Sequence, residues 1–215
     1  MGFVGALHQF HDPEFVREWA KRFKPNKQRS RLFELVFSLI ESSGPPHKHV
    51  AEIGIGPGYL AQYILSRNPV ITYEGVDFSE PMFEIAKTNI GHHMSRVQLT
   101  SANLFDNIWR TALSKQPNII VSTWTLHDLG SKAAVHNVYK QCYKALPPGG
   151  MLINGDFIKP VGTSHDFEGG RFEVTEHLRL MKDSGFLSPK CLLHFEQNLI
   201  TPTASENYAC MMGVR

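Results

Sequence analysis

From about residue 49 onward, short apolar runs alternate with stretches whose apolar residues recur at helical spacing. The apolar runs predict strands near 49–53, 70–76, 97–101, 118–123 and 151–157. The stretches between them predict helices near 58–66, 80–91, 107–114 and 131–146. This alternation of strand and helix favours a parallel sheet that is covered by helices on both faces.

The end of the chain has a different pattern. A helix is predicted near 171–184, with Gly185 at its C-terminus, and strand-like runs follow near 191–196 and 208–214. A polar loop that contains Pro202 joins these two runs. Because no helix lies between them, we expect them to pair as an antiparallel hairpin. The whole pattern predicts an α/β fold with a doubly wound, mostly parallel sheet.

Two helices are predicted before the first strand. The first covers about residues 12–23 and begins with Asp-Pro-Glu, which supplies an N-cap, a proline in the first turn and an acid at the positive helix end. The second covers about residues 30–41 and is ended by the Ser-Gly-Pro-Pro of residues 43–46. We expect residues 1–46 to form a helical cap or lid on one domain of residues 47–215.

Composition narrows the functional class. The 215 residues are 42% hydrophobic and 20% charged, with a formal net charge of +2, which is ordinary for a globular protein. This small net charge does not indicate binding to nucleic acid or to an anionic membrane. No apolar run is long enough to span a bilayer. The basic residues between positions 21 and 31 are interpreted as a solvated helix end and linker rather than as a recognition patch.

The cysteines and the start of the chain indicate a reducing compartment. Cys142, Cys191 and Cys210 are far apart and odd in number, so they predict neither a disulfide framework nor a zinc site. The first residues lack a basic segment ahead of an apolar run, which argues against a signal peptide. We therefore expect a cytoplasmic protein.

Three alternate glycines follow the first predicted strand in the segment VAEIGIGPGYL, residues 50–60. A dinucleotide-binding loop would have its third glycine where this chain has Tyr59. Glu52 lies just before the loop, and its carboxylate would repel a pyrophosphate but attract a cation. S-adenosylmethionine fits this charge, because it carries a sulfonium and an ammonium group and no phosphate. The alternative is that Glu52 only caps a neighbouring backbone amide.

Polar residues also follow the next two strands. Asp77 lies roughly 20 residues after the loop, where an acid can accept hydrogen bonds from both hydroxyls of a ribose. The alternative is that Asp77 caps the helix that begins near Ser79. Asn103 follows the third strand and could read the amino group of adenine, although asparagine is also a common turn residue.

Together these segments resemble the class I S-adenosylmethionine-dependent methyltransferases over about residues 47–215. The segments that resemble successive motifs of that family are AEIGIGPG, EGVDFSEPMFEIAK, TSANLFD, NIIVSTWTLHDL and ALPPGGMLINGDF. The resemblance implies a seven-stranded sheet that ends in an antiparallel hairpin, and S-adenosyl-L-methionine as the cofactor. Asn103 and Asn118 stand where the family usually has aspartate, so the chain departs from the pattern there.

The resemblance also implies which residues contact the cofactor. The expected cofactor-binding residues are Glu52, Gly54, Gly56, Gly58, Asp77, Phe78, Asn103, Leu104 and Thr123. Asp77 would bind the ribose, and Phe78 would lie beside the adenine.

His127 is the candidate general base for methyl transfer. It follows the fourth predicted strand, so it should border the crevice, and an imidazole is suited to proton transfer near neutral pH. Asp128 comes next and could orient a neighbouring group. The alternative is that His127 only packs against the end of the strand.

The remaining candidates should line the pocket of the methyl acceptor. They are Phe10, Trp19, Trp124, Asp156 and His165. Phe10 and Trp19 belong to the predicted N-terminal helical region, which would close over the site as a lid. The alternative is that this amphipathic region only packs against the core.

These features predict a methyltransferase that acts on the oxygen, nitrogen or carbon of a small molecule. The chain lacks an Asn/Asp-Pro-Pro-Tyr segment after the fourth strand, a separate target-recognition domain and a cluster of metal ligands. We therefore expect no metal, no nucleic-acid partner and no membrane, in a monomer or a homodimer. Two alternatives stay open, namely a cofactor-binding module without catalysis and a nicotinamide-dependent dehydrogenase.

Overall fold

One seven-stranded sheet organises the protein. The computed structural model describes residues 8–44, 47–163, 167, 169–195 and 207–215. The strands are β1 (His49–Ile53), β2 (Thr72–Asp77), β3 (Val97–Ser101), β4 (Ile119–Thr123), β5 (Met151–Phe157), β6 (Leu187–Phe195) and β7 (Tyr208–Val214), in the order β3-β2-β1-β4-β5-β7-β6. The first five pair in parallel, and β7 pairs antiparallel with both β5 and β6. The predicted fold class is confirmed.

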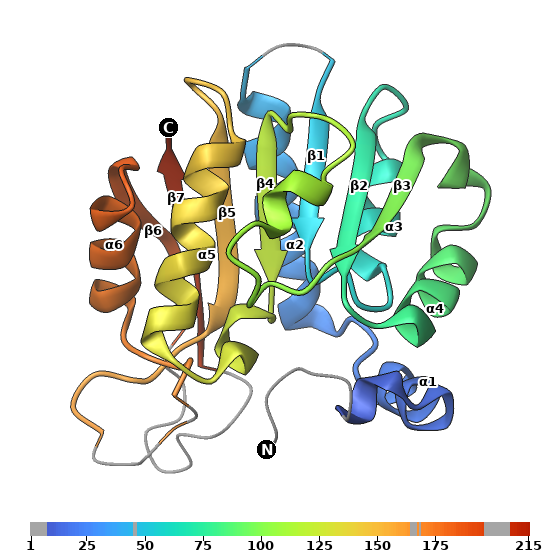
Figure 1. Ribbon diagram of the computed structural model, residues 1–215, viewed down its shortest axis with the longest axis horizontal. Helices are drawn as coiled ribbons and strands as arrows, with labels where there is room; N and C mark the ends of the chain where they lie inside the picture. The colour runs from blue at the N-terminus through green and yellow to red at the C-terminus, as the bar shows by residue number, and fades with distance from the viewer. Residues whose placement is uncertain (1–7, 45–46, 164–166, 168, 196–206) are drawn as a thin grey trace.

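Helices cover both faces of the sheet, with α5 in front and α2 behind in Figure 1. The helices are α1 (Pro13–Arg22), α2 (Lys27–Ser42), α3 (Tyr59–Leu65), α4 (Glu80–Ile90), α5 (Lys132–Ala145) and α6 (Val174–Asp183). Short 3-10 turns are η1 (Gln9–His11), η2 (Gly91–Arg96), η3 (Trp109–Ala112) and η4 (Leu126–Leu129). Successive strand side chains point to opposite faces, so Val50 joins the core under α2, α3 and α4, and Ala51 joins the core under α5 and α6.

The two N-terminal helices differ in how they pack. Leu32, Val36 and Ile40 of α2 are fully buried in the same core as strand residues of β1 and β4. In contrast, the buried residues of α1 are only Val16 and Ala20. Helix α2 therefore belongs to the main core, and the segment that lies beyond the strand ends is η1 with α1 (Figure 1).

The ligand crevice of this topology lies between β1 and β4. These strands are neighbours, but the chain leaves β1 for β2 on one side and leaves β4 for β5 on the other. In open α/β sheets, ligands bind beyond the carboxyl ends of the strands at such a reversal. The glycine loop follows β1 and η4 follows β4, while α1 lies beyond the same strand ends (Figure 1).

One predicted helix is wrong. Residues 107–114 form only the four-residue turn η3 rather than a helix. Trp109 is buried there, but Ile108 is 65% exposed, so the segment does not bury one continuous apolar face. Its end is held instead by Glu74, whose carboxylate accepts hydrogen bonds from the Ser114 backbone N–H at 2.9 Å and the Ser114 hydroxyl at 2.7 Å. Hydrogen bonds to a buried carboxylate on β2 thus hold the segment in a conformation other than the predicted helix.

Smaller differences concern element boundaries. Helix α2 begins at Lys27 rather than near residue 30, because the Asn26 side chain caps it by accepting a hydrogen bond from the Arg29 backbone N–H at 2.9 Å. Strand β6 begins at Leu187, before the predicted run, and its pairing with β7 is irregular. The predicted loop at Pro202 lies outside the described residues. In the part of the chain that the structure describes, every helix is too short or too polar to cross a membrane.

Candidate active site

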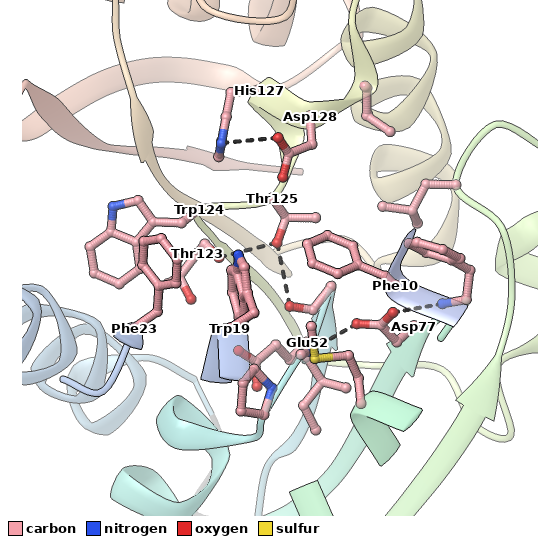
Figure 2. Close-up of a pocket in the computed structure, with 18 of the residues that line it drawn as sticks. Phe10, Trp19, Phe23, Glu52, Asp77, Thr123, Trp124, Thr125, His127 and Asp128 are labelled. Carbon is pink, nitrogen blue, oxygen red and sulfur yellow. Dashed lines mark hydrogen bonds and ion pairs between the residues drawn. The ribbon is translucent and has the colours of Figure 1, made fainter. Parts of the chain in front are cut away.

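A pocket of about 450 Å³ lies beyond the carboxyl ends of β1, β2 and β4. The glycine loop, the residues that follow β3 and β4, and the N-terminal segment η1–α1 all contribute to its wall. Figure 2 shows Glu52 at one side of the pocket and His127 and Asp128 at another, with Phe10 on one flank and Phe23 and Trp124 on the opposite flank. Most of the residues that sequence reasoning assigned to the cofactor and to the acceptor therefore meet in one cavity, whereas Gly58 and Asp156 are not part of its wall.

The glycine loop leaves open space at Gly56. Gly56 has a φ of +48°, and a Cβ placed on it would find no protein atom within 4 Å. Gly54 is different, because a Cβ there would overlap the side chain of Thr125. Backbone N–H groups of Gly54 and Ile55 donate to the Val76 carbonyl oxygen at 2.8 and 3.1 Å. The loop is therefore pinned to β2, and Gly56 allows a ligand to approach its backbone closely.

Asp77 ties the end of β2 to this loop. Its Oδ2 accepts a hydrogen bond from the Gly56 backbone N–H at 2.9 Å. Its Oδ1 accepts from the N–H groups of Phe78 and Ser79 at 2.8 and 3.0 Å. Burial raises the pKa of Asp77, although these three donors counteract that effect. The side chain that caps α4 is Ser79, whose hydroxyl accepts from the Met82 N–H, so the capping alternative for Asp77 is wrong.

Glu52 is buried at the floor of the pocket. Its Oε2 accepts a hydrogen bond from the Tyr73 hydroxyl at 2.8 Å, rather than from a backbone amide. Burial and the nearby charge of Asp77 raise the pKa of Glu52 to about 8, although the bond from Tyr73 opposes the shift. Burial and a neighbouring carboxyl both disfavour the ionised form of Glu52. A bound cation would stabilise that ionised form.

The residues expected beside the nucleoside also line the pocket. Phe78, Asn103, Leu104 and Thr123 are all part of its wall. The Oδ1 of Asn103 accepts a hydrogen bond from the Phe105 N–H at 3.0 Å, which is the turn contact expected of asparagine in a loop. This contact uses one lone pair of the amide oxygen, and another remains for a ligand donor.

His127 is fixed by a carboxylate on the neighbouring strand. Its Nδ1 lies 2.7 Å from Oδ1 of Asp156, and its backbone N–H donates to Oδ2 of Asp156 at 3.0 Å. Because a carboxylate can only accept, Nδ1 carries a proton. Nε2 is 3.3 Å from Asp128 Oδ1. Burial alone would lower the pKa of His127, but Asp156 and Asp128 raise it above the ordinary value.

The expectation that Asp156 lines the acceptor pocket is wrong. Asp156 is fully buried behind His127 and is not part of the pocket wall. The reason is its position near the end of β5, where Gly155 pairs with Thr123 and the next side chain turns toward η4. Phe10, Trp19 and Trp124 do line the pocket as expected, whereas His165 lies outside the described residues.

Arg29 lines the same pocket, and sequence reasoning missed it. Its guanidinium lies over the ring of Trp124 at 4.5 Å and near the ring of Phe23 at 5.4 Å. Trp124 itself has a φ of +50°, which is strained for a bulky residue and is typical of functional sites. The sequence favours a solvated helix end for the basic residues between positions 21 and 31, because residue spacing does not show that this one side chain faces inward.

These residues fit S-adenosylmethionine. The open space at Gly56 allows close approach to the loop backbone, and Asp77 offers carboxylate oxygens at its edge. Glu52 supplies an acidic group suited to a cation. The described residues contain no cluster of side chains that could hold a metal ion.

Comparisons with known proteins agree with this geometry. Residues 51–152 match the family model described as a methyltransferase domain. The chain is similar to the malonyl-[acyl-carrier protein] O-methyltransferase of Priestia megaterium, with 29% identity over 130 residues, which are 60% of this chain and 44% of the relative. It is also similar to the eugenol O-methyltransferase of Sorghum bicolor, with 32% identity over 111 residues, which are 52% of this chain and 26% of the relative. The chain spans less than half the length of either relative.

A solved structure extends the likeness to almost the whole chain. Human N-acetylserotonin methyltransferase in complex with SAM matches with a TM-score of 0.69 at 15% sequence identity. The match covers 99% of this chain and 60% of that chain. At this level of identity, the likeness concerns the fold.

Proposed function

We propose that this chain is a class I S-adenosylmethionine-dependent methyltransferase, and that it transfers a methyl group from S-adenosylmethionine to an oxygen of a small acceptor. The observation that carries the proposal is the contact between His127 and Asp156 beside the cofactor-type loop. A positioned imidazole is useful when the acceptor arrives protonated, as a hydroxyl does. The O-methyltransferases among the relatives support the same choice of atom.

In this proposal His127 is the general base. Asp156 holds the Nδ1–H, so the neutral imidazole has its lone pair on Nε2, and the acceptor hydroxyl replaces Asp128 as the partner of Nε2. His127 removes the hydroxyl proton, and the resulting imidazolium is stabilised by the buried Asp156 carboxylate. S-adenosylmethionine, when bound, would supply an electrophilic methyl group to the deprotonated acceptor oxygen; a new oxygen–carbon bond would replace the carbon–sulfur bond, and S-adenosylhomocysteine would be the second product.

The remaining pocket residues orient and enclose the reactants. Asp77 binds the ribose hydroxyls, and Glu52 binds the cationic part of the cofactor. Trp124 and Phe157 form an aromatic wall next to His127, with the rings of His127 and Phe157 4.9 Å apart. Such a wall would exclude water and hold the acceptor in line with the methyl group, and positioning of this kind supplies much of the rate.

The experiment that tests the proposal combines binding and turnover. Calorimetry with S-adenosylmethionine and S-adenosylhomocysteine measures cofactor binding. Incubation with S-adenosylmethionine and a panel of phenols, alcohols and carboxylic acids measures S-adenosylhomocysteine and the O-methylated product by mass spectrometry. We expect equimolar formation of both products. Binding of S-adenosylmethionine without methyl transfer to any acceptor would instead favour a cofactor-binding module. Binding of a reduced nicotinamide cofactor, without binding of S-adenosylmethionine, would favour a dehydrogenase.

A further inference from the structure

Arg171 is a nearly buried cation beside the site, and the steps proposed for His127 do not use it. Only 8% of Arg171 is exposed. Its guanidinium lies over the ring of Phe157 at 4.9 Å and over the ring of Phe167 at 5.4 Å. An arginine keeps its charge at any physiological pH. Because Arg171 is not part of the pocket wall, this charge is placed to act on the residues of the pocket rather than on a ligand.

Phe157 connects Arg171 to His127. The ring of Phe157 packs edge-on against the imidazole, with the ring centres 4.9 Å apart. One ring therefore contacts both the guanidinium and the imidazole. The backbone N–H of Phe157 also donates to Oδ1 of Asp156 at 2.8 Å, and the same oxygen lies 2.7 Å from Nδ1 of His127. A change at Arg171 thus reaches the imidazole through the ring that packs on it and through the residue next to its carboxylate partner.

The backbone on both sides of Arg171 is held in place. A Cβ on Gly170 would overlap the carbonyl oxygen of His127, so the two backbones are in close contact there. On the other side, the Phe172 carbonyl oxygen accepts a hydrogen bond from the Lys159 N–H at 3.1 Å, which ties it to the segment that follows β5. The guanidinium therefore starts from a fixed position relative to the turn that carries the imidazole.

Charged groups from three parts of the fold surround the imidazole of His127. Asp156 comes from β5, Asp128 from η4 itself, and Arg171 from the segment before α6, while His8, which precedes η1, faces Asp128. Burial lowers the pKa of His127, Asp156 and Asp128 raise it, and Arg171 lowers it again. The two carboxylates alone would favour the imidazolium, which cannot accept a proton. A general base works best when its pKa lies near the working pH, so a third charge of opposite sign is useful here.

We propose that Arg171 is a positioning residue that keeps His127 ready to accept a proton. Its guanidinium holds the ring of Phe157 against the imidazole, and its charge offsets those of Asp156 and Asp128. The inference rests on the proposed function for the use that is made of the neutral imidazole. The influence of Arg171 on the ionisation of His127 requires no acceptor and no cofactor, so it can be measured in the free protein.

The experiment follows the imidazole of His127 by NMR while the pH of the free protein is varied. Its resonance is identified as the one that is missing from His127→Ala. Arg171→Met removes the charge and keeps an apolar side chain against Phe157, and Arg171→Gln is a second neutral variant in case the first does not fold. Arg171→Lys keeps the charge without the flat guanidinium. The matched control is Lys182→Gln, which removes an exposed charge from the nearby helix α6.

We expect the neutral variants of Arg171 to move the titration midpoint of His127 to higher pH, because the loss of a nearby positive charge favours the imidazolium. Arg171→Lys should keep the midpoint close to that of the normal protein, and Lys182→Gln should not move it. Calorimetry with S-adenosylhomocysteine should give the same affinity for all variants, because Arg171 lies outside the pocket wall. An unchanged midpoint in the neutral variants would overturn the inference. Equal shifts in Arg171→Lys and Arg171→Met would also overturn it and leave Arg171 as a packing contact of Phe157.

The result is separable from the proposed function. If the midpoint of His127 moves in the neutral variants but no acceptor is ever methylated, the role of Arg171 stands and the methyltransferase proposal fails. If methyl transfer is found and the midpoint does not move, the proposed function stands and the role of Arg171 fails. If both hold, the rate of Arg171→Met at neutral pH should fall by roughly three- to tenfold and should recover as the pH is raised, which the loss of a packing contact would not produce.

Discussion

Asp156 contacts His127 twice, at the imidazole Nδ1 through Oδ1 at 2.7 Å and at the backbone N–H through Oδ2 at 3.0 Å. The two contacts fix both the ring and the turn that carries it. Asp156 comes from β5 and His127 from η4, so the pair forms only when the sheet is assembled. This arrangement keeps a proton on Nδ1, while Nε2 lies 3.3 Å from Oδ1 of Asp128.

The first prediction concerns His127 as a base. His127→Ala should lower kcat by about 10²–10⁴-fold, while the KM for the cofactor stays nearly constant, because the side chain acts on the acceptor. The normal enzyme should gain activity as pH rises through the raised pKa of His127, since the imidazole must lose its proton to accept one. Steady-state kinetics across pH checks both points. His92→Asn, an exposed histidine outside the pocket, is the control. A pH dependence that survives in His127→Ala would exclude this role.

The second prediction concerns the proton on Glu52. With a pKa of about 8, the carboxyl is mostly protonated at pH 7 in the free protein. A bound cation favours the ionised form and lowers this pKa, so cofactor binding at pH 7 should release a proton. Calorimetry in buffers of different ionisation enthalpy measures the released protons. Glu52→Gln should abolish the proton release and weaken the binding of the cofactor. Proton uptake on binding would contradict the assignment.

The third prediction concerns Asp77. Asp77→Ala removes the expected ribose acceptor, and the loss of a charge-assisted bond costs about 1.5–3 kcal/mol, which is roughly a 10- to 100-fold loss of affinity. The substitution also leaves the N–H groups of Gly56, Phe78 and Ser79 without their acceptor, so the melting temperature should fall as well. Asp77→Asn separates the effects, because it keeps a neutral acceptor. Unchanged affinity in titration calorimetry would remove Asp77 from the cofactor site.

The fourth prediction concerns the open space at Gly56. Gly56→Val should abolish cofactor binding, because its side chain would fill space that the protein leaves empty. Gly44→Val is the matched control, since Gly44 has a similar φ of +51°, an equally open Cβ position and no contact with the pocket. Both variants should lose about 1–2 kcal/mol of stability from backbone strain. If Gly56→Val binds the cofactor as the normal protein does, the loop is not the cofactor cradle.

The fifth prediction concerns the N-terminal segment as a lid. The Ser79 hydroxyl donates to the Phe10 carbonyl oxygen at 2.5 Å, and the Tyr59 hydroxyl donates to the Ala20 carbonyl oxygen at 2.9 Å. A chain that begins at Pro25 loses these contacts and the rings of Phe10 and Trp19. We expect it to lose methyl transfer and to bind the cofactor more weakly, since Phe10 and His11 contact Phe78. Normal turnover by the shortened chain would exclude a lid.

The sequence by itself determined the sheet and the cofactor-type loop. Strands β1, β3, β5 and β7 match the predicted runs closely, because each strand is read from its own apolar residues. The roles expected of Glu52, Gly56 and Asp77 depend on short strand–loop–helix segments, whose geometry is set by neighbouring residues. Local patterns of this kind survive folding with little change.

Only the tertiary structure decided how the part of the pocket around His127 and Trp124 is built. Asp156 reaches His127 because β5 lies beside β4, and Arg29 reaches Trp124 because α2 packs behind the sheet. The helix expected at residues 107–114 fails for the same kind of reason, since Glu74 on β2 binds Ser114. The physical cause is common to these cases. Each contact joins residues far apart in the chain, and the spacing of hydrophobic residues carries no information about which distant side chain will meet them.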